Sequence, residues 1–291
     1  MNPTTIPVAV DLVAQLEAIA QFLPPPRIAR LHVPAYPGAA AQCSAAFCAV
    51  ELEDGAFGLS YLLLGDTLRG WVTPDGRTQP LAGSDPLAVA RGFVTGTGFA
   101  RAIALACINA LTDSAWRRSG YTPPAAGNSL GDIQLGATDH LGMIGFFPPL
   151  VRQVQATGAR LTVVELDEAT IQRQQERFPG VTITLERSAL APCNVVVGTS
   201  TMLLNDTLDA MLAAAPSARR FAVIGPSAGL WPDALFARGV TLLGGTRIVD
   251  GAGFAAAIAS GASWSGSARK FALSADTWPG WQAVCGLETR A

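Results

Sequence analysis

Residues Leu141–Asp167 read LGMIGFFPPLVRQVQATGARLTVVELD, and this stretch decides the fold. An apolar run, a segment with helical spacing and a second apolar run predict a strand, a helix and a parallel strand. The turn after the first strand reads Phe146-Phe147-Pro148-Pro149, where nucleotide-binding folds place glycines. Two prolines remove two N–H donors, and two phenylalanines fill the space that a diphosphate needs. The stretch therefore predicts a nucleotide-type architecture without the usual pyrophosphate site.

The rest of the second half continues this alternation of strands and helices, which is typical of a doubly wound parallel sheet. We place this α/β domain at residues 126–291. The predicted strands are Leu141–Phe146, Leu161–Glu165, Val181–Thr184, Asn194–Val197, Phe221–Ile224 and Val240–Leu243. The predicted helices are Pro149–Thr157, Glu168–Phe178, Thr207–Ala215 and Asp233–Ala237.

The first half has a different pattern and predicts a smaller α+β domain over residues 1–125. Val8–Phe22 has the apolar spacing of an amphipathic helix. Ser44–Leu64 alternates on both sides of a turn and predicts a hairpin with one buried face. Phe99–Ser114 reads as a mostly buried helix. The glycine- and proline-rich segment Ser119–Thr138 predicts either a linker or a loop that lines a crevice.

Composition excludes several classes of partner. Charged residues make up only 14% of the 291 residues, the net charge is −2 and the pI is near 5.7, so nucleic acid and anionic membranes are not expected partners. No apolar run reaches the ~20 residues that a membrane-spanning helix needs, and the beginning lacks a basic region, so we expect a cytoplasmic protein. Six tryptophans and a 49% hydrophobic content favour a homo-oligomer, with a homodimer expected.

Residues that commonly bind metals or react covalently are few and scattered. The five cysteines show no paired CxxC spacing and are expected to be core thiols: Cys43, Cys48, Cys107, Cys193 and Cys285. The histidines are His32 and His140, and His140 is expected at the sheet end opposite the crevice. We therefore predict no metal site made from these side chains. Lys270 is the only lysine, and an exposed side chain is expected in preference to a Schiff-base lysine.

Candidate binding residues follow the predicted strands, because ligands of open parallel sheets lie beyond the carboxyl ends of the strands. These residues are Phe147, Pro148, Glu165, Thr199, Ser200, Thr201, Pro226, Ser227 and Gly245. Glu165 could accept hydrogen bonds from a ribose diol, or Glu165 or Asp167 could cap the helix that starts near Glu168. The hydroxyls of Thr199–Thr201 could hold a carboxylate or phosphate oxygen, or cap the next helix. Both pairs of alternatives remain open.

A set of motifs is spread over the second half of the chain: Gly142–Pro148, Glu165, Val197–Thr201, Ile224–Ser227 and Gly244-Gly245 ahead of Asp250. These motifs give the chain a resemblance to a bacterial and archaeal family labelled "putative heavy-metal chelation", whose members join an enolase N-terminal-like domain to a Rossmann-like domain. The resemblance implies a Rossmann-like parallel sheet preceded by a smaller enolase N-terminal-like domain, with a ligand site between the two. Phe147, Glu165, Thr199, Ser200, Pro226 and Ser227 would form the sheet side of that site. Asn109 or the Asn128–Asp132 loop would supply the other wall.

The leading functional hypothesis is binding of a small polar metabolite or metal chelate in the interdomain cleft, in metal homeostasis or metallophore metabolism, with or without catalysis. An alternative is an enzyme that uses S-adenosylmethionine or another adenosine-type cofactor, with Glu165 on the ribose. A third hypothesis is a structural role for a fold without a ligand, since one architecture hosts many functions. The sequence identifies neither the cofactor nor the reaction.

Overall fold

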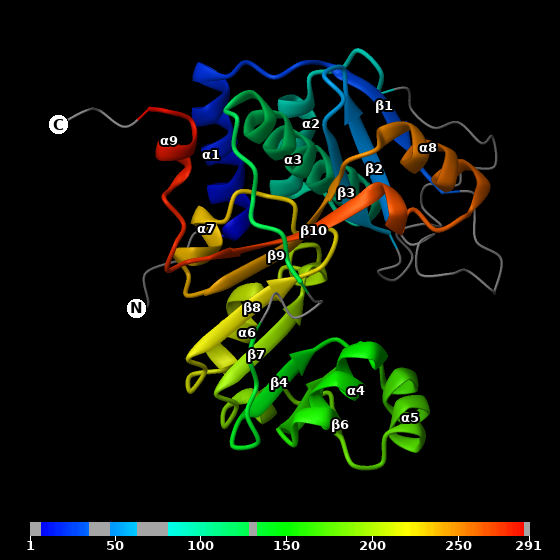
Figure 1. The fold of residues 1–291 in the computed structure, drawn as a ribbon, viewed down its shortest axis with the longest axis vertical. Helices are drawn as coiled ribbons and strands as arrows, with labels where there is room; N and C mark the ends of the chain where they lie inside the picture. The colour runs from blue at the N-terminus through cyan, green and yellow to red at the C-terminus, as the bar shows by residue number, and fades with distance from the viewer. Residues whose placement is uncertain (1–6, 35–46, 63–80, 128–132, 288–291) are drawn as a thin grey trace.

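The computed structural model describes residues 7–34, 47–62, 81–127 and 133–287. Figure 1 shows a helix-rich part that contains a small sheet and, beside it, a long twisted sheet that extends away from it. The small sheet has three antiparallel strands, and the long sheet has seven strands. This mixed α/β architecture confirms the predicted fold class.

The first part combines three helices with the antiparallel sheet, whose strand order is β1-β2-β3. Its elements are α1 (Val8–Phe22), β1 (Ile28–His32), β2 (Phe47–Leu52), β3 (Phe57–Tyr61), α2 (Pro86–Thr95) and α3 (Gly98–Arg118). Helix α2 begins at Pro86, because Asp85 accepts a hydrogen bond from the Leu87 N–H and Pro86 occupies the first turn. Strand β1 was not predicted.

The hairpin β2–β3 is buried on both faces, so the prediction of one buried face was wrong. Gly58 lies so close to α3 that a Cβ atom there would be 2.0 Å from the Ala106 carbonyl oxygen. On the opposite face Phe57 packs edge-on against Phe254, with ring centroids 5.5 Å apart. A pattern of alternation cannot reveal this second layer, because Phe254 is about two hundred residues away in the sequence.

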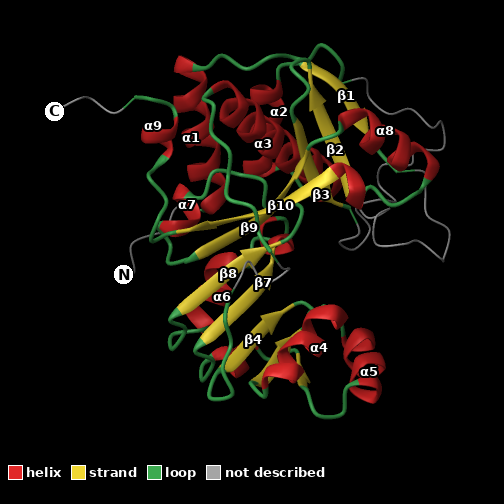
Figure 2. Cartoon of the chain, in the orientation of Figure 1, coloured by secondary structure: helices red, strands yellow, loops and turns green. Residues whose placement is uncertain are grey.

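The second part is built on the seven-stranded sheet, with strand order β10-β9-β8-β7-β4-β5-β6. All neighbours are parallel except β9 and β10. Its strands are β4 (His140–Ile144), β5 (Arg160–Val164), β6 (Thr182–Thr184), β7 (Val195–Thr199), β8 (Arg220–Ile224), β9 (Leu242–Ile248) and β10 (Ala268–Ser274). Its helices are α4 (Pro148–Thr157), α5 (Glu168–Arg177), α6 (Leu208–Ala214), α7 (Asp233–Phe236), α8 (Gly251–Ser260) and α9 (Trp281–Val284), with a short 3-10 helix η3 (Ser200–Leu203) (Figure 2).

The six parallel strands follow the 3-2-1-4-5-6 order of doubly wound dinucleotide-type sheets when they are numbered from β4. The chain leaves β4 toward β5 on one side and reaches β7 on the other. The carboxyl ends of β4 and β7 therefore form the topological switch point, which is where such sheets bind ligands.

The end of the sheet differs from the prediction. Gly244, Gly245 and Thr246 lie inside β9 and not in a loop beyond a strand end. Gly245 pairs with Phe271 of β10, and a Cβ atom on Gly245 would be 2.3 Å from the Phe271 ring and 2.5 Å from the Ala228 carbonyl oxygen. Glycine is therefore needed at position 245 for close packing within a strand. In the sequence alone, the pair Gly244-Gly245 looks like a turn. Strand β10 and helices α8 and α9 were not predicted.

The largest buried cluster draws residues from both parts of the molecule. Trp116 of α3 packs edge-on against Trp231, with ring centroids 5.7 Å apart, and against Phe271 of β10 at 5.4 Å. The boundary near residue 125 stays a prediction, since the core is continuous across it.

Two further observations concern single segments and side chains. No helix in the described ranges is long and apolar enough to cross a membrane. Cys48, Cys107 and Cys193 are free and buried, as expected for core thiols, and Cys285 is half-buried. Cys43 and the Asn128–Asp132 loop lie outside the described residues.

Candidate ligand-binding site

A cavity of about 750 Å³ lies beyond the carboxyl ends of the parallel strands, and we call it the main cavity. Its floor is formed by loops that follow β4, β5, β7 and β8, and its other wall by β2 and β3 of the antiparallel sheet. The lining side chains include Phe146, Phe147, Glu165, Leu166, Asp167, Thr199, Ser200, Thr201, Met202, Pro226, Ser227, Phe47 and Tyr61. Seven of the residues selected from the sequence thus meet in one space.

The turn after β4 has the shape that its sequence requires. Gly145 adopts a left-handed conformation with φ of +83°, which favours glycine. The N–H of Phe146 donates to Glu165 Oε1 at 2.5 Å. Phe147 then precedes α4, and Pro148 occupies the first helical turn, where its missing N–H costs nothing. Pro148 is not among the described residues that line the cavity, so its predicted role as a ligand contact has no geometric support.

Glu165 holds this turn in place and also faces the cavity. Its second oxygen accepts the N–H of Leu166 at 3.2 Å. Burial raises the pKa of Glu165 above its usual range, against the lowering effect of the two backbone N–H groups. The cap of α5 is Asp167, which accepts the N–H of Thr170 at 3.0 Å. Because a carboxylate has about four acceptor positions, Glu165 keeps capacity for a ligand.

The loops after β7 and β8 bring hydroxyl groups to the same space. Thr199 Oγ1 accepts hydrogen bonds from the N–H of Thr201 at 3.3 Å and from the Thr201 hydroxyl at 3.2 Å. Gly225 has a φ of +138°, and a Cβ atom there would be 2.5 Å from Ser200 Oγ. The two loops can approach this closely only because residue 225 is glycine.

Ser227 connects the main cavity to the first part of the molecule. Its hydroxyl accepts the N–H of Tyr61 at 2.9 Å, and its carbonyl oxygen accepts Asn109 Nδ2 at 2.9 Å. The same amide nitrogen of Asn109 donates to the Leu59 carbonyl oxygen at 2.7 Å. Asn109 is 2% exposed and is not among the described lining residues, so the expected wall residue is a structural link. Phe47 and Tyr61 form that wall instead.

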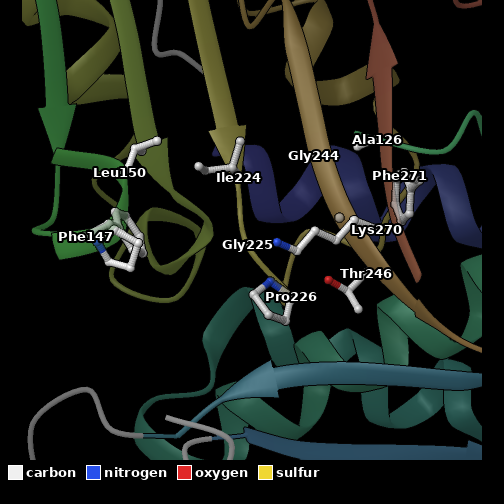
Figure 3. A pocket seen from close by; sticks show the side chains of 12 residues that line it. Ala126, Phe147, Leu150, Ile224, Gly225, Pro226, Gly244, Thr246, Lys270 and Phe271 are labelled. Atoms are coloured by element: carbon white, nitrogen blue, oxygen red, sulfur yellow. The ribbon is translucent and has the colours of Figure 1, made fainter. Parts of the chain in front are cut away.

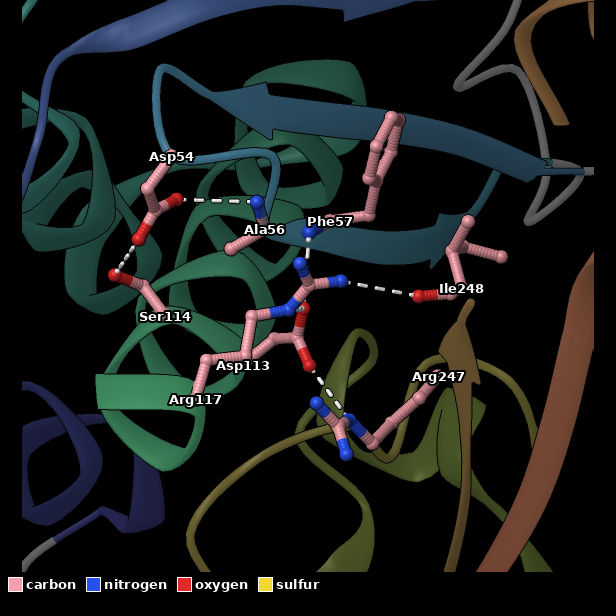
Figure 4. A network of polar contacts seen from close by, with 8 residues as sticks. All are labelled: Asp54, Ala56, Phe57, Asp113, Ser114, Arg117, Arg247 and Ile248. Atoms are coloured by element: carbon pink, nitrogen blue, oxygen red, sulfur yellow. Dashed lines mark hydrogen bonds and ion pairs between the residues drawn. The ribbon is translucent and has the colours of Figure 1, made fainter. Parts of the chain in front are cut away.

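Two charged residues of α3, which the sequence analysis did not select, connect this helix to neighbouring elements: Arg101 to the segment after β7, and Asp113 to β9 and β3. Arg101 donates to the Leu203 carbonyl oxygen at 3.0 Å and forms an ion pair with Asp206. Asp113 accepts Arg247 Nε of β9 at 2.6 Å and the N–H of Phe57 at 3.3 Å (Figure 4). Charged residues inside an otherwise apolar helix were the signal available in the sequence, since buried charges need partners.

A second space of about 260 Å³, which we call the side cavity, adjoins the main cavity. The two cavities share Phe147, Gly225 and Pro226. Gly245 lines the side cavity, and the Lys270 side chain extends into it (Figure 3). Lys270 is exposed, as expected from the sequence.

Histidine side chains lie away from both cavities. His140 begins β4 at the opposite end of the strand, and its ring nitrogen lies 2.8 Å from the Thr162 hydroxyl. His32 lies 2.8 Å from Glu51 in the antiparallel sheet. Within the described ranges, no group of three or more His, Cys, Asp and Glu side chains is arranged to hold a metal ion.

Two family models match the sequence. The model described as "Putative heavy-metal chelation" matches residues 130–275, which is half of the chain. The chain belongs to this family. A second model with the same description matches residues 40–112 and so covers the first part of the molecule. The resemblance inferred from the sequence motifs is confirmed.

Solved structures of this family share the fold. A protein of unknown function from Pyrococcus horikoshii is 16% identical, with a TM-score of 0.65 over 92% of this chain and 99% of that one. A second, from Desulfitobacterium hafniense, is 20% identical, with a TM-score of 0.58 over 91% of this chain and 98% of that one. No curated protein matches the sequence.

Proposed function

We propose that the protein binds a small polar metabolite or a metal chelate in the main cavity and acts in metal homeostasis or metallophore metabolism. The observation that carries this proposal is the position of the cavity at the switch point between β4 and β7. Open α/β sheets bind ligands at this point, and a volume of about 750 Å³ falls within the range of small-molecule sites.

The chemistry of the lining favours a ligand with many polar groups. Glu165 and Asp167 supply carboxylates, and Thr199, Thr201 and Tyr61 supply hydroxyls. Hydroxyls both donate and accept, so together with carboxylates they suit amines, hydroxyls and carboxyl groups of a metabolite. The family description adds the link to heavy metals. A metal that is already held by an organic chelator needs few protein donors, and oxygen-rich walls then recognise the chelator.

The proposal is tested first on the protein purified from its own host. Native mass spectrometry combined with elemental analysis should reveal a bound organic molecule, with or without a stoichiometric metal. Calorimetric titration with citrate, histidine and their Ni²⁺, Co²⁺, Zn²⁺ and Fe³⁺ complexes then defines the preferred class.

A pair of matched variants assigns the binding to the main cavity. Thr201→Val removes a cavity hydroxyl without a large change in volume, and binding should weaken about three- to tenfold. Thr277→Val changes an exposed threonine that follows β10 and is not among the described residues lining the main cavity, so it should leave binding unaltered. If Thr201→Val and Glu165→Gln both bind the identified ligand as tightly as the unmodified protein, the proposal fails.

An adenosine-type cofactor, such as S-adenosylmethionine, is the second candidate. It is favoured by the position of Glu165 directly after β5, the strand that follows the β4–α4 unit. The two backbone N–H groups bound to Glu165 leave acceptor positions for a ribose diol. Thermal-shift measurements with S-adenosylmethionine, S-adenosylhomocysteine and adenosine test this candidate, and unchanged melting temperatures with all three would reject it. A cytoplasmic location and a homodimer stay predictions from composition.

A further inference from the structure

The side cavity differs from the main cavity in its chemistry. Most of its lining is apolar, with Leu150, Ile224 and Phe271 among the contributing side chains. Thr246 and Lys270 provide the polar side chains of the described lining, and no carboxylate is among them. Apolar walls beside one ammonium group are suited to an apolar stem that ends in an anion.

The two cavities are continuous along a seam formed by Phe147, Gly225 and Pro226, which line both. Figure 3 shows the Lys270 side chain directed across the side cavity toward Gly225, while Phe147 stands on the other side. The main cavity carries the carboxylates of Glu165 and Asp167. Among the described lining residues, carboxylates therefore belong to the main cavity and the ammonium group to the side cavity.

The position of Lys270 is fixed by the pairing of the last two strands. Lys270 of β10 lies opposite Thr246 of β9, and Phe271 lies opposite Gly245. Because glycine at position 245 lets the Phe271 ring lie against β9, the ring forms one wall of the side cavity. The Lys270 stem can then lie along an apolar surface while its ammonium group reaches the cavity.

We infer that the side cavity is a subsite for a carboxylate carried on a short apolar arm of the ligand, with Lys270 as its counter-charge. The inference rests on the proposed function, since the rest of that ligand would occupy the main cavity. A carboxylate fits better than a phosphate because one ammonium group and one hydroxyl match a single negative charge, whereas a dianion needs more donors.

Hexanoate and its neutral isostere hexanamide probe the subsite directly. We expect saturable binding of hexanoate to the full chain and at least about tenfold weaker binding of hexanamide, because the amide cannot pair with the ammonium group. Lys270→Met should weaken hexanoate binding at least about tenfold, and Lys270→Arg should restore most of it. Arg269→Met removes one positive charge from the neighbouring exposed position and should leave hexanoate binding unchanged.

A second measurement reports on the ammonium group itself. Reductive methylation with ¹³C-formaldehyde labels Lys270, the only lysine, and the amino terminus, and it preserves both charges. Hexanoate should shift the NMR signal of the Lys270 dimethylammonium group while the amino-terminal signal serves as an internal control. The inference is overturned if hexanoate does not bind, if hexanamide binds equally well, or if Lys270→Met binds hexanoate as the unmodified protein does. Metal chelates could still bind the main cavity in each case, so the two proposals fail separately.

Discussion

Asp139 connects the starts of three parallel strands at the edge of the sheet opposite the cavities. Its carboxylate accepts the N–H of Gly136 at 2.8 Å, Asn194 Nδ2 at 3.0 Å and Arg219 Nη2 at 2.5 Å. The Gly136 N–H, with smaller effects from Arg219 and Asn194, lowers the pKa of Asp139 although burial opposes this shift. The ionised carboxylate is therefore the form that the fold stabilises.

Asp139→Asn should lower the free energy of unfolding by ~1–3 kcal/mol at pH 7. A lowered pKa in the folded state gives stability that is present above the ordinary aspartate pKa and is lost as the pH falls through the lowered value. The difference between variant and unmodified protein should thus shrink as the pH is reduced below about 4. Urea unfolding over this pH range measures this difference in the free energy of unfolding, and Asp276→Asn, at an exposed position, is the control. A difference that is the same at every pH would contradict the assignment.

At this scale the sequence predicts where a side chain lies better than what it contacts. Glu165 was selected because it follows a strand, and the structure places it on the main cavity. Its bond with the Phe146 N–H depends on the left-handed Gly145, which no local pattern specifies. Asn109 was assigned to the cavity wall, but the Leu59 and Ser227 carbonyl oxygens hold it in the core. Contacts between distant segments therefore determine where the Glu165 and Asn109 side chains lie.

The contact between β3 and α3 is unusually close for a strand and a helix. Gly58 allows it, because a Cβ atom at this position would be 2.0 Å from the Ala106 carbonyl oxygen and 2.1 Å from the Ala110 nitrogen. Backbone atoms of a long buried helix cannot move independently to make room. This packing positions Tyr61, the last residue of β3, against the main cavity.

Gly58→Ala should therefore destabilise the protein by about 3 kcal/mol or more, through overpacking of β3 against α3. Gly92→Ala is the matched control, since its new Cβ atom would lie 3.9 Å from the Ala104 Cβ, an ordinary contact, within α2. It should stabilise the protein by ~0.5–1 kcal/mol through helix propensity. Chemical denaturation measures the free energy of unfolding of both variants. Equal changes in this free energy would show that the close contact between β3 and α3 is not rigid.

Elements with a local signature were predictable, whereas pairings between distant segments were not. The β4–α4–β5 unit follows from apolar runs and helical spacing within a short stretch. Strand β9 was misread because Gly244 and Gly245 resemble turn residues, and their use depends on Phe271 in β10. Strand β1 shows no regular alternation of burial, and it is defined by its pairing with β2, from which it is separated in the sequence.

The whole molecule behaves structurally as one packed unit, although the sequence suggests two domains. The aromatic contacts of Trp116 with Trp231 and Phe271 cross between the parts. Asp113 of α3 binds Arg247 of β9 at 2.6 Å in a largely buried pair. We expect a cavity between such parts to be largely preformed, which would reduce the ordering cost of binding.

We therefore expect the two parts to unfold together. Cys107 in α3 and Cys193 before β7 are fully buried thiols, one in each part, and can report on unfolding separately. Burial raises the pKa of both thiols, that of Cys193 to about 11, so neither should react at pH 8 in the folded protein. Pulsed thiol labelling through a urea series, read by peptide mass spectrometry, should give one midpoint for both cysteines.

Asp113→Asn tests whether the contact between the parts maintains this coupling. It leaves the Arg247 charge without its buried partner and should cost ~3 kcal/mol. If the core is shared, the midpoints of Cys107 and Cys193 should fall together and by the same amount, because neither part retains its buried surface once the other unfolds. Separate midpoints, or a shift confined to Cys107, would instead establish two independent domains and would make the shape of the main cavity dependent on how those domains dock.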